Sequence, residues 1–230
     1  MPRTIPFTSK LGFSSRLNRR ATASHLAAFG REFHRRSWAL GTSGNYSAVL
    51  SRNPLHLLIT SSGLDKSALT ERGFLEINGQ GDILAGKGKP SAETALHLTV
   101  ARMRETAGCI LHTHSVWNTL LSEQYAGQGG FAVSGYEMLK GLEGVRSHKH
   151  REWLPIFEND QDLPALARKV AVELERDTAA HGFLIAGHGL YTWGEDLAQA
   201  RRHVEIFEFL FEVVSRREFG SQQPPVLEGA

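Results

Sequence analysis

The sequence is short of several features, and each shortage excludes a class of protein. Cys109 is the only cysteine, which excludes an internal disulfide and suits a reducing compartment. No run of residues approaches the roughly 18 apolar residues that a membrane span needs. Neither sign of charge dominates, with 26 basic against 24 acidic residues, so nothing resembles the basic footprint of a nucleic-acid-binding protein.

Acidic residues are also missing before Glu32, although this segment holds six lysines and arginines. That composition resembles an organelle transit peptide. The spacing of Leu17, Ala21, Ala28 and Phe33, however, continues as a helix toward the following turn. We therefore interpret the segment as part of the fold and expect a cytoplasmic protein.

What is present fits one globular domain. The 230 residues are 41% hydrophobic and 22% charged, which is enough for a sizeable core in a soluble protein. No internal repeat, linker or shift in composition divides the chain. We predict a single domain of mixed α/β character over residues 1–230, with about 14 N-terminal and about 10 C-terminal residues irregular.

Local patterns predict alternating helices and short strands. The expected helices are 15–38, 91–106, 116–125, a short one within 134–141, 162–180 and 195–217. The expected strands are 48–51, 55–60, 74–78, 109–115, 153–157, 183–186 and 190–193. Ser91 is the expected N-cap of the second helix, and 126–130 is expected to be a flexible loop. In the last helix, Ile206, Phe209, Leu210 and Val213 widen the apolar surface beyond one face, which indicates a subunit contact.

The stretch from Cys109 to Ser115 is the part most suited to chemistry, because it contains His112 and His114. Side chains alternate along a strand, so these two imidazoles share one face with Ile110. They are close enough to lean onto one metal ion. Two half-buried histidines at the end of a strand are the structural alternative.

His188 and Glu93 are the best further candidates for a metal site. His188 lies between two glycines at the tip of a predicted hairpin, where its side chain projects. Three histidines with an open fourth position describe a catalytic zinc site. Glu93 points inward on its helix, where a carboxylate needs a partner, and it could occupy the fourth position at rest. His148 and His150 form a second His-x-His pair, but their charged neighbours favour a solvated edge.

Three turns rich in small residues predict an anion site. They are Ser43-Gly44-Asn45, Ser61-Ser62-Gly63 and Pro90-Ser91. Free backbone N–H groups and hydroxyls in such turns can hold a phosphate, most readily at the N-terminus of a helix. A further acid, Glu137, lies in the short glycine-flanked helix, and from the residues alone a surface position is the simpler interpretation.

Together these motifs resemble the class II aldolase family. The resemblance covers about residues 15–217 and rests on four motifs: Ser43-Gly44-Asn45, Pro90-Ser91-Ala92-Glu93, His112-Thr113-His114 and Gly187-His188-Gly189. Within the family, the segments 136–141, 153–160 and 188–194 resemble a branch of dehydratases, which remove water from a ketose phosphate. The resemblance implies a three-layer α/β/α sandwich around a mainly antiparallel sheet, usually assembled as a homotetramer.

The resemblance also implies roles for particular residues. Zinc would be held by His112, His114 and His188, and Glu93 and Glu137 would be the catalytic acid–base groups. The phosphate would be bound by Asn45, Ser62, Gly63 and Ser91. Ala92 stands where many relatives have a second serine, so one phosphate donor is missing or replaced.

Two other functions remain open from the sequence. The first is a sugar-phosphate aldolase or 4-epimerase with the same fold and metal, which would break a carbon–carbon bond. The second is a non-catalytic binding domain like the adducin head, which we expect to have lost metal ligands. The three histidines and Glu93 argue against the second.

Overall fold

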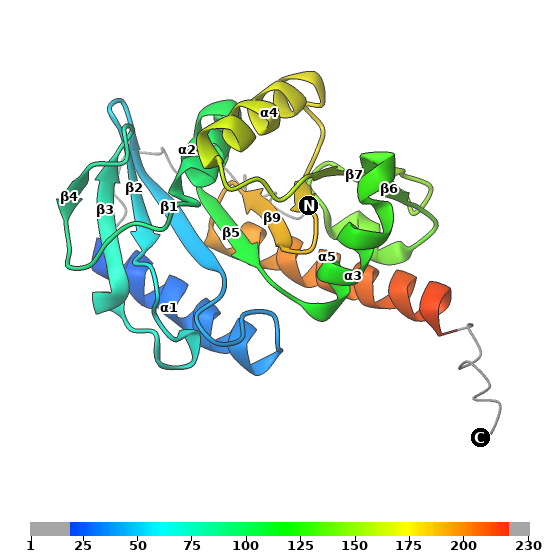
Figure 1. Ribbon diagram of the computed structural model, residues 1–230, viewed down its shortest axis with the longest axis horizontal. Coiled ribbons are helices and arrows are strands. Elements are labelled where there is room, and N and C mark those ends of the chain that lie inside the picture. Colours follow the sequence, from blue (N-terminus) through cyan, green and yellow to red (C-terminus); the bar gives the residue numbers. More distant parts are fainter. Residues whose placement is uncertain (1–18, 221–230) are drawn as a thin grey trace, which may run out of the picture.

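The computed structural model describes residues 19–220 (Figure 1). The predictions for residues 1–14, for the start of the first helix at Ser15 and for the tail after Gly220 lie outside this range. No helix in the described part is long and apolar enough to cross a membrane.

The centre of the molecule is a nine-stranded sheet with the order β4-β3-β2-β1-β5-β9-β8-β7-β6. Its strands are β1 (Asn45–Arg52), β2 (Leu55–Thr60), β3 (Phe74–Asn78), β4 (Ile83–Ala85), β5 (Cys109–Thr113), β6 (Gly130–Val133), β7 (Glu152–Phe157), β8 (Gly182–Ile185) and β9 (Gly189–Gly194). All neighbouring strands are antiparallel except β7 and β8. The expectation of a mainly antiparallel sheet is confirmed.

Helices cover both faces of this sheet, as Figure 1 shows. They are α1 (Arg19–Arg35), α2 (Thr94–Met103), α3 (Val116–Tyr125), α4 (Leu163–Arg176) and α5 (Leu197–Phe219), with short 3₁₀ turns η1 (Lys66–Ala68), η2 (Glu71–Gly73), η3 (Ala126–Gln128) and η4 (Glu137–Gly141). α2 and α4 pack on one face, whereas α1 and α5 pack on the other. The three-layer sandwich is therefore confirmed.

The alternation predicted for β5 determines which core each of its side chains enters. Ile110 packs in the core beneath α2 and α4. Cys109 and Leu111 pack in the opposite core with α1 and α5. His112 therefore points to the α2 side of the sheet, which is the face where a site can form beside the start of α2.

Two local predictions were wrong, and the strands β4 and β6 were not predicted. α2 begins at Thr94 with Glu93 as its N-cap, because a turn from Ser91 O to Thr94 N precedes the helix. Ser91 is therefore not the N-cap, and its hydroxyl instead accepts from the backbone N–H of Glu93. Residues 126–130 are not a flexible loop but η3 followed by the first residue of β6. The three-residue strand β4, exposed throughout, gave no apolar alternation to detect.

The apolar surface of α5 is mostly used within the chain. Ile206 and Leu210 are buried in a third core with β6, β7 and η4, and Val213 is partly buried. Phe209 is the member of this set that remains exposed. The extra width of the apolar face is thus explained by intramolecular packing, and the subunit contact inferred from it loses most of its support.

Candidate active site

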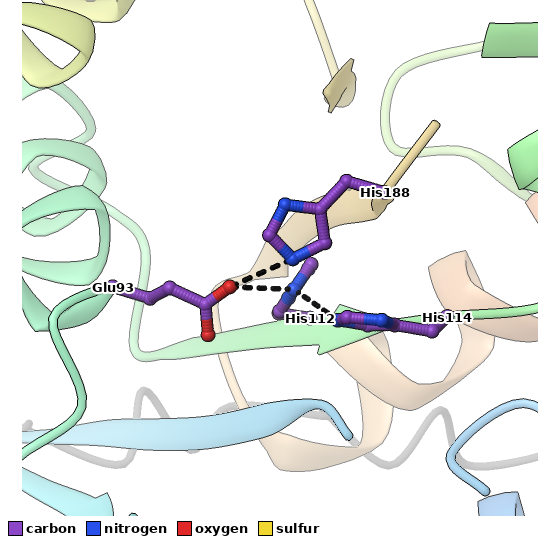
Figure 2. Close-up of side chains that lie close together, drawn as sticks. All are labelled: Glu93, His112, His114 and His188. Carbon is purple, nitrogen blue, oxygen red and sulfur yellow. Dashed lines mark hydrogen bonds and ion pairs between the residues drawn. The ribbon is translucent and has the colours of Figure 1, made fainter. Parts of the chain in front are cut away.

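The pairing of β5 with β9 brings the three predicted metal ligands together. His112 is in β5, His114 follows the strand, and His188 lies in the turn that leads into β9. Because His112 pairs with Tyr191 in an antiparallel register, the start of β9 lies beside the end of β5. One ligand atom from each of Glu93, His112, His114 and His188 lies within 4.8 Å of all the others. Figure 2 shows the four side chains converging.

The orientation of His112 leaves one ring nitrogen free for a metal. Its Nδ1 faces the carbonyl oxygen of Leu190 at 2.8 Å and must donate to it, so Nε2 carries the lone pair. That Nε2 lies 2.7 Å from Nε2 of His114. The His112 ring also stacks on Tyr191, with centroids 4.0 Å apart and an interplanar angle of 15°. The sheet thus fixes both the tautomer and the plane of this imidazole.

Burial keeps a second ligand neutral. Desolvation, followed by the nearby His112 and His188, lowers the pKa of His114 to about 2. A neutral imidazole offers its lone pair at ordinary pH, which is what a metal requires.

Glu93 completes the set from the start of α2. Its Oε1 lies 2.8 Å from Nε2 of His188 and 3.5 Å from Nε2 of His112. Burial opposes ionisation of this carboxyl, but the nearby imidazoles of His112 and His188 outweigh it and hold its pKa well below the usual range. The residues form a cluster able to hold a metal ion, with three imidazole nitrogens and one carboxylate.

The other oxygen of Glu93 is held by a buried network that includes His97. Asn45 donates its amide to Glu93 Oε2, and its own carbonyl oxygen accepts from His97 Nε2. On the far side of the ring, Ser47 Oγ lies 2.8 Å from Nδ1. Burial lowers the pKa of His97 to about 3, so the ring is neutral and carries one proton. The four-residue spacing between Glu93 and His97 is the sequence signal that places this ring near the site.

A small cleft beside the cluster gathers the predicted phosphate-binding residues. Its volume is about 80 Å³. Its lining includes Asn45, Ser62, Gly63 and Ser91, all four residues predicted from the family resemblance. Lys66 also lines the cleft, and no sequence motif had indicated it.

Glu137 is not in the cluster and does not line this cleft. Its side chain is 70% exposed, and its carboxylate contacts Lys140 at 2.8 Å and His148 at 3.2 Å. The hydrogen bond from Lys140 is the main cause that lowers its pKa. Close packing anchors the 3₁₀ turn η4 that carries Glu137. Leu139 is fully buried, and the backbone of Gly141 lies so close to Ile206 that a Cβ there would meet Cδ1 at 2.5 Å.

The rival His-x-His pair lies elsewhere. His148 contacts Glu137, and His150 contacts Glu152 at 2.7 Å. Within residues 19–220, neither belongs to a group of side chains that could hold a metal. The preference for His112 and His114 over this pair agrees with the geometry.

Comparison with known proteins places these features in a family. Residues 24–215 match the model of the class II aldolase and adducin N-terminal domain. A methylthioribulose-1-phosphate dehydratase of Serratia proteamaculans is 43% identical over 182 residues, which cover 79% of this chain and 88% of that protein. One from Methylococcus capsulatus is 42% identical over 194 residues, covering 84% and 93%.

Solved structures support the fold alone. An L-fuculose 1-phosphate aldolase superposes with a TM-score of 0.74 at 20% identity, covering 92% of this chain and 94% of that one. YgbL of Escherichia coli, described as a putative aldolase/epimerase/decarboxylase, gives 0.70 at 24% identity, covering 90% and 92%. With the family model spanning most of the chain, this protein belongs to the class II aldolase and adducin N-terminal domain family.

Proposed function

We propose that this protein is a hydro-lyase of methionine salvage that removes water from 5-methylthioribulose 1-phosphate to give 2,3-diketo-5-methylthiopentyl 1-phosphate. The observation that carries the proposal is the identity of about 42% with dehydratases of that name over most of both chains. Such a reaction needs a metal ion, and the converging side chains of Glu93, His112, His114 and His188 supply a set of ligands for one. The single buried cysteine suits the cytoplasm, where we place the enzyme.

The cofactor we propose is zinc. His112, His114 and His188 would hold the ion through Nε2 atoms, since these are the nitrogens that meet. Imidazole ligands with an open position favour zinc, although the same set accepts other divalent metals. When bound, the metal would polarise the C2 ketone of the substrate as a Lewis acid. Glu93, kept ionised, would occupy the fourth position at rest and take part in proton transfer near C3.

We propose that the phosphate of the substrate lies in the small cleft, bound by Asn45, Ser62, Gly63 and Ser91. These residues come from three turns, and Gly63 adopts a φ of +75°, which opens its turn without a side chain. Ala92 supplies no hydroxyl here, so the cleft depends on fewer side-chain donors than in many relatives.

Glu137 is the acid–base group that we propose for the loss of water. It would take the C3 proton and then protonate the C4 hydroxyl as it leaves, after which the enol becomes the diketone. Since one copy of the chain keeps Glu137 away from its own cluster and anchors it through Leu139, the proposal requires a second copy to supply it. This agrees with the homotetramer that the family resemblance implies.

Mixing inactive variants would test this arrangement. Glu137→Gln should lower turnover by about 10² to 10⁴-fold while the metal content stays unchanged. When Glu137→Gln and His188→Ala are co-expressed, or mixed and refolded together, part of the activity should return. Some sites then combine the intact histidine cluster of one copy with the intact Glu137 of the other. Full turnover by Glu137→Gln would remove the residue from the mechanism, and absence of complementation would place its action within one copy.

An aldolase or 4-epimerase is the second candidate, favoured by the fold shared with L-fuculose 1-phosphate aldolase. An adducin-like binding domain would be expected to have lost metal ligands, whereas this protein keeps all four candidate ligands. Incubating the purified enzyme with methylthioribulose 1-phosphate and following the products by NMR separates the two reactions. Dehydration gives the diketone, whereas an aldolase gives dihydroxyacetone phosphate and an aldehyde.

A further inference from the structure

Lys66 is the one side chain of the small cleft that combines full burial with a cationic head. It is the first residue of η1 and is 1% exposed. Its Nζ donates to the carbonyl oxygens of Thr42 and Leu64, each at 2.9 Å. An ammonium group has three N–H donors, and these two bonds use two of them.

Carboxylates act on this ammonium only from a distance. Within residues 19–220, none forms an ion pair with Lys66, although nearly all buried lysines in proteins are paired. Burial lowers the pKa of Lys66 to about 8, with Glu93 and Asp65 acting in the opposite direction. The group therefore remains mostly protonated near pH 7. A buried positive charge held only by carbonyl dipoles is costly, and an anion from outside would relieve that cost.

The position of Lys66 joins the two turns that form the cleft. Thr42 precedes the turn 43–45, and Leu64 follows the turn 61–63. By bonding to both carbonyls, the ammonium fixes the two turns relative to each other. The cleft beside them is lined by Ser43, Ser61, Ser62 and Ser91. The backbone N–H groups of Ser43, Ser61 and Ser62 already donate to carbonyl oxygens, so the serine hydroxyls, which can rotate, are left to serve a tetrahedral anion beside Lys66.

We propose that Lys66 is the cationic phosphate-binding residue of this protein, compensating the charge of the substrate's phosphate while it holds both turns in place. The inference rests on the proposed function for the identity of the substrate, but its chemistry concerns the phosphate group alone. It assigns the cleft a dianion rather than a neutral sugar hydroxyl. It also gives a reason why the cleft can lack the second serine at position 92.

The test uses the full-length, metal-loaded protein, with inorganic phosphate as the probe in calorimetric titrations. Lys66→Met removes the charge and all three N–H donors, whereas Lys66→Gln keeps a neutral donor. We expect each to weaken phosphate binding by about 10- to 100-fold, the range for a hydrogen bond to a charged group. Lys169→Met, which removes an exposed lysine of α4, is the matched control and should bind phosphate as the unaltered protein does.

Kinetics with methylthioribulose 1-phosphate separate binding from a purely structural role. If Lys66 acts on the phosphate, KM rises by a similar factor in both variants while kcat falls much less, and metal content is unchanged. The proposal would be overturned if both variants lost kcat and thermal stability to the same extent while Lys66→Gln still bound phosphate as tightly as the unaltered protein. It would also be overturned if the unaltered protein bound no phosphate. The same holds if neither substitution changed phosphate affinity, which is the result expected when phosphate binds to the metal instead. Absence of turnover together with Lys66-dependent phosphate binding would refute the dehydratase and leave this inference standing.

Discussion

Two clusters of three histidines and one glutamate lie on this sheet, and their difference is instructive. The β5 cluster consists of Glu93, His112, His114 and His188. The β7 cluster consists of Glu152, His150, His181 and His203, linked by ion pairs and ring contacts. Both combine buried and partly buried side chains, yet only the first, among the described residues, can hold a metal ion.

The difference lies in what occupies the ring nitrogens. In the β7 cluster, His181 donates from Nδ1 to Glu152 at 3.0 Å and from Nε2 to the carbonyl of Glu143 at 2.8 Å. A ring that donates from both nitrogens is an imidazolium and has no lone pair. His203 likewise has both nitrogens in use, with the Trp193 carbonyl and the Glu143 N–H. In the β5 cluster, each histidine turns one nitrogen toward a shared point. Three histidines and a carboxylate therefore make a metal site only where lone pairs remain.

The largest effect should follow from removing one ligand of the β5 cluster. His188→Ala should lose the bound metal and reduce turnover by at least about 10³-fold, since a Lewis acid is worth several kcal/mol to such a reaction. Metal analysis of the purified variant and NMR assay of the product would measure both. His150→Ala, from the β7 cluster, is the matched control and should keep its metal and nearly all of its activity. Loss of metal in both variants would break the comparison.

The next effect concerns stability and belongs to the β7 cluster. Glu152 is almost fully buried between His150 and His181, so Glu152→Gln should lower the free energy of unfolding by about 3 kcal/mol by leaving a buried charge without its partner. Urea unfolding monitored by circular dichroism would measure it. Turnover by the folded variant should be unaffected.

The dependence of this loss on pH sharpens the prediction. Although burial opposes it, hydrogen bonding to Glu152 raises the pKa of His181 above 6.5, so the stabilisation is complete below that value and declines as pH rises through the raised pKa. Hydrogen bonds from His181 lower the pKa of Glu152 below 4.5 despite burial, so the contribution also declines as pH falls through that lowered pKa. The gap in stability between the two proteins should be widest between pH 4.5 and 6.5. A gap independent of pH would contradict the imidazolium assignment.

The smallest effect should come from the network behind Glu93. His97→Leu removes the hydrogen bond that fixes the amide of Asn45, so Glu93 loses its oriented donor while the metal keeps its ligands. We expect kcat to fall about tenfold, the cost of roughly one hydrogen bond to a charged group, with little change in metal content. Thr99→Ala on the same helix, whose hydroxyl bonds only to the Ala95 carbonyl, is the control. An unchanged kcat would return His97 to a purely structural role.

The convergence of the candidate ligands could be anticipated from the sequence because their signals are local. Alternation placed His112 and His114 on one face, and the two glycines marked His188 as the tip of a turn. The family resemblance supplied the four residues that line the small cleft and the order of layers. Nothing local, however, showed that Asn45 would meet His97, because 52 positions separate them and their contact depends on how α2 packs over β1. Lys66 was missed for the same reason, since its carbonyl partner at Thr42 is 24 positions away.

Misplaced predictions have similarly physical causes. Ser91 satisfies every preference for an N-cap, yet a turn involving its own carbonyl delays the helix until Thr94. Much of the broad apolar face of α5 is used within the chain, where β6, β7 and η4 cover Ile206 and Leu210, and the subunit contact stays a prediction. Periodicity reports that a face is buried, but it does not report which element buries it.

The three nitrogen ligands differ in how firmly they are built in, which has a consequence for engineering. His112 is clamped between a carbonyl and an aromatic ring within the sheet, so replacing it disturbs folding and metal affinity together. His188 lies in a turn, and its Nδ1 has no hydrogen-bond partner among the described residues. Redesign toward a different ion or a new reaction should therefore begin at the 186–189 turn, where the donor can be exchanged at the least expense to the scaffold.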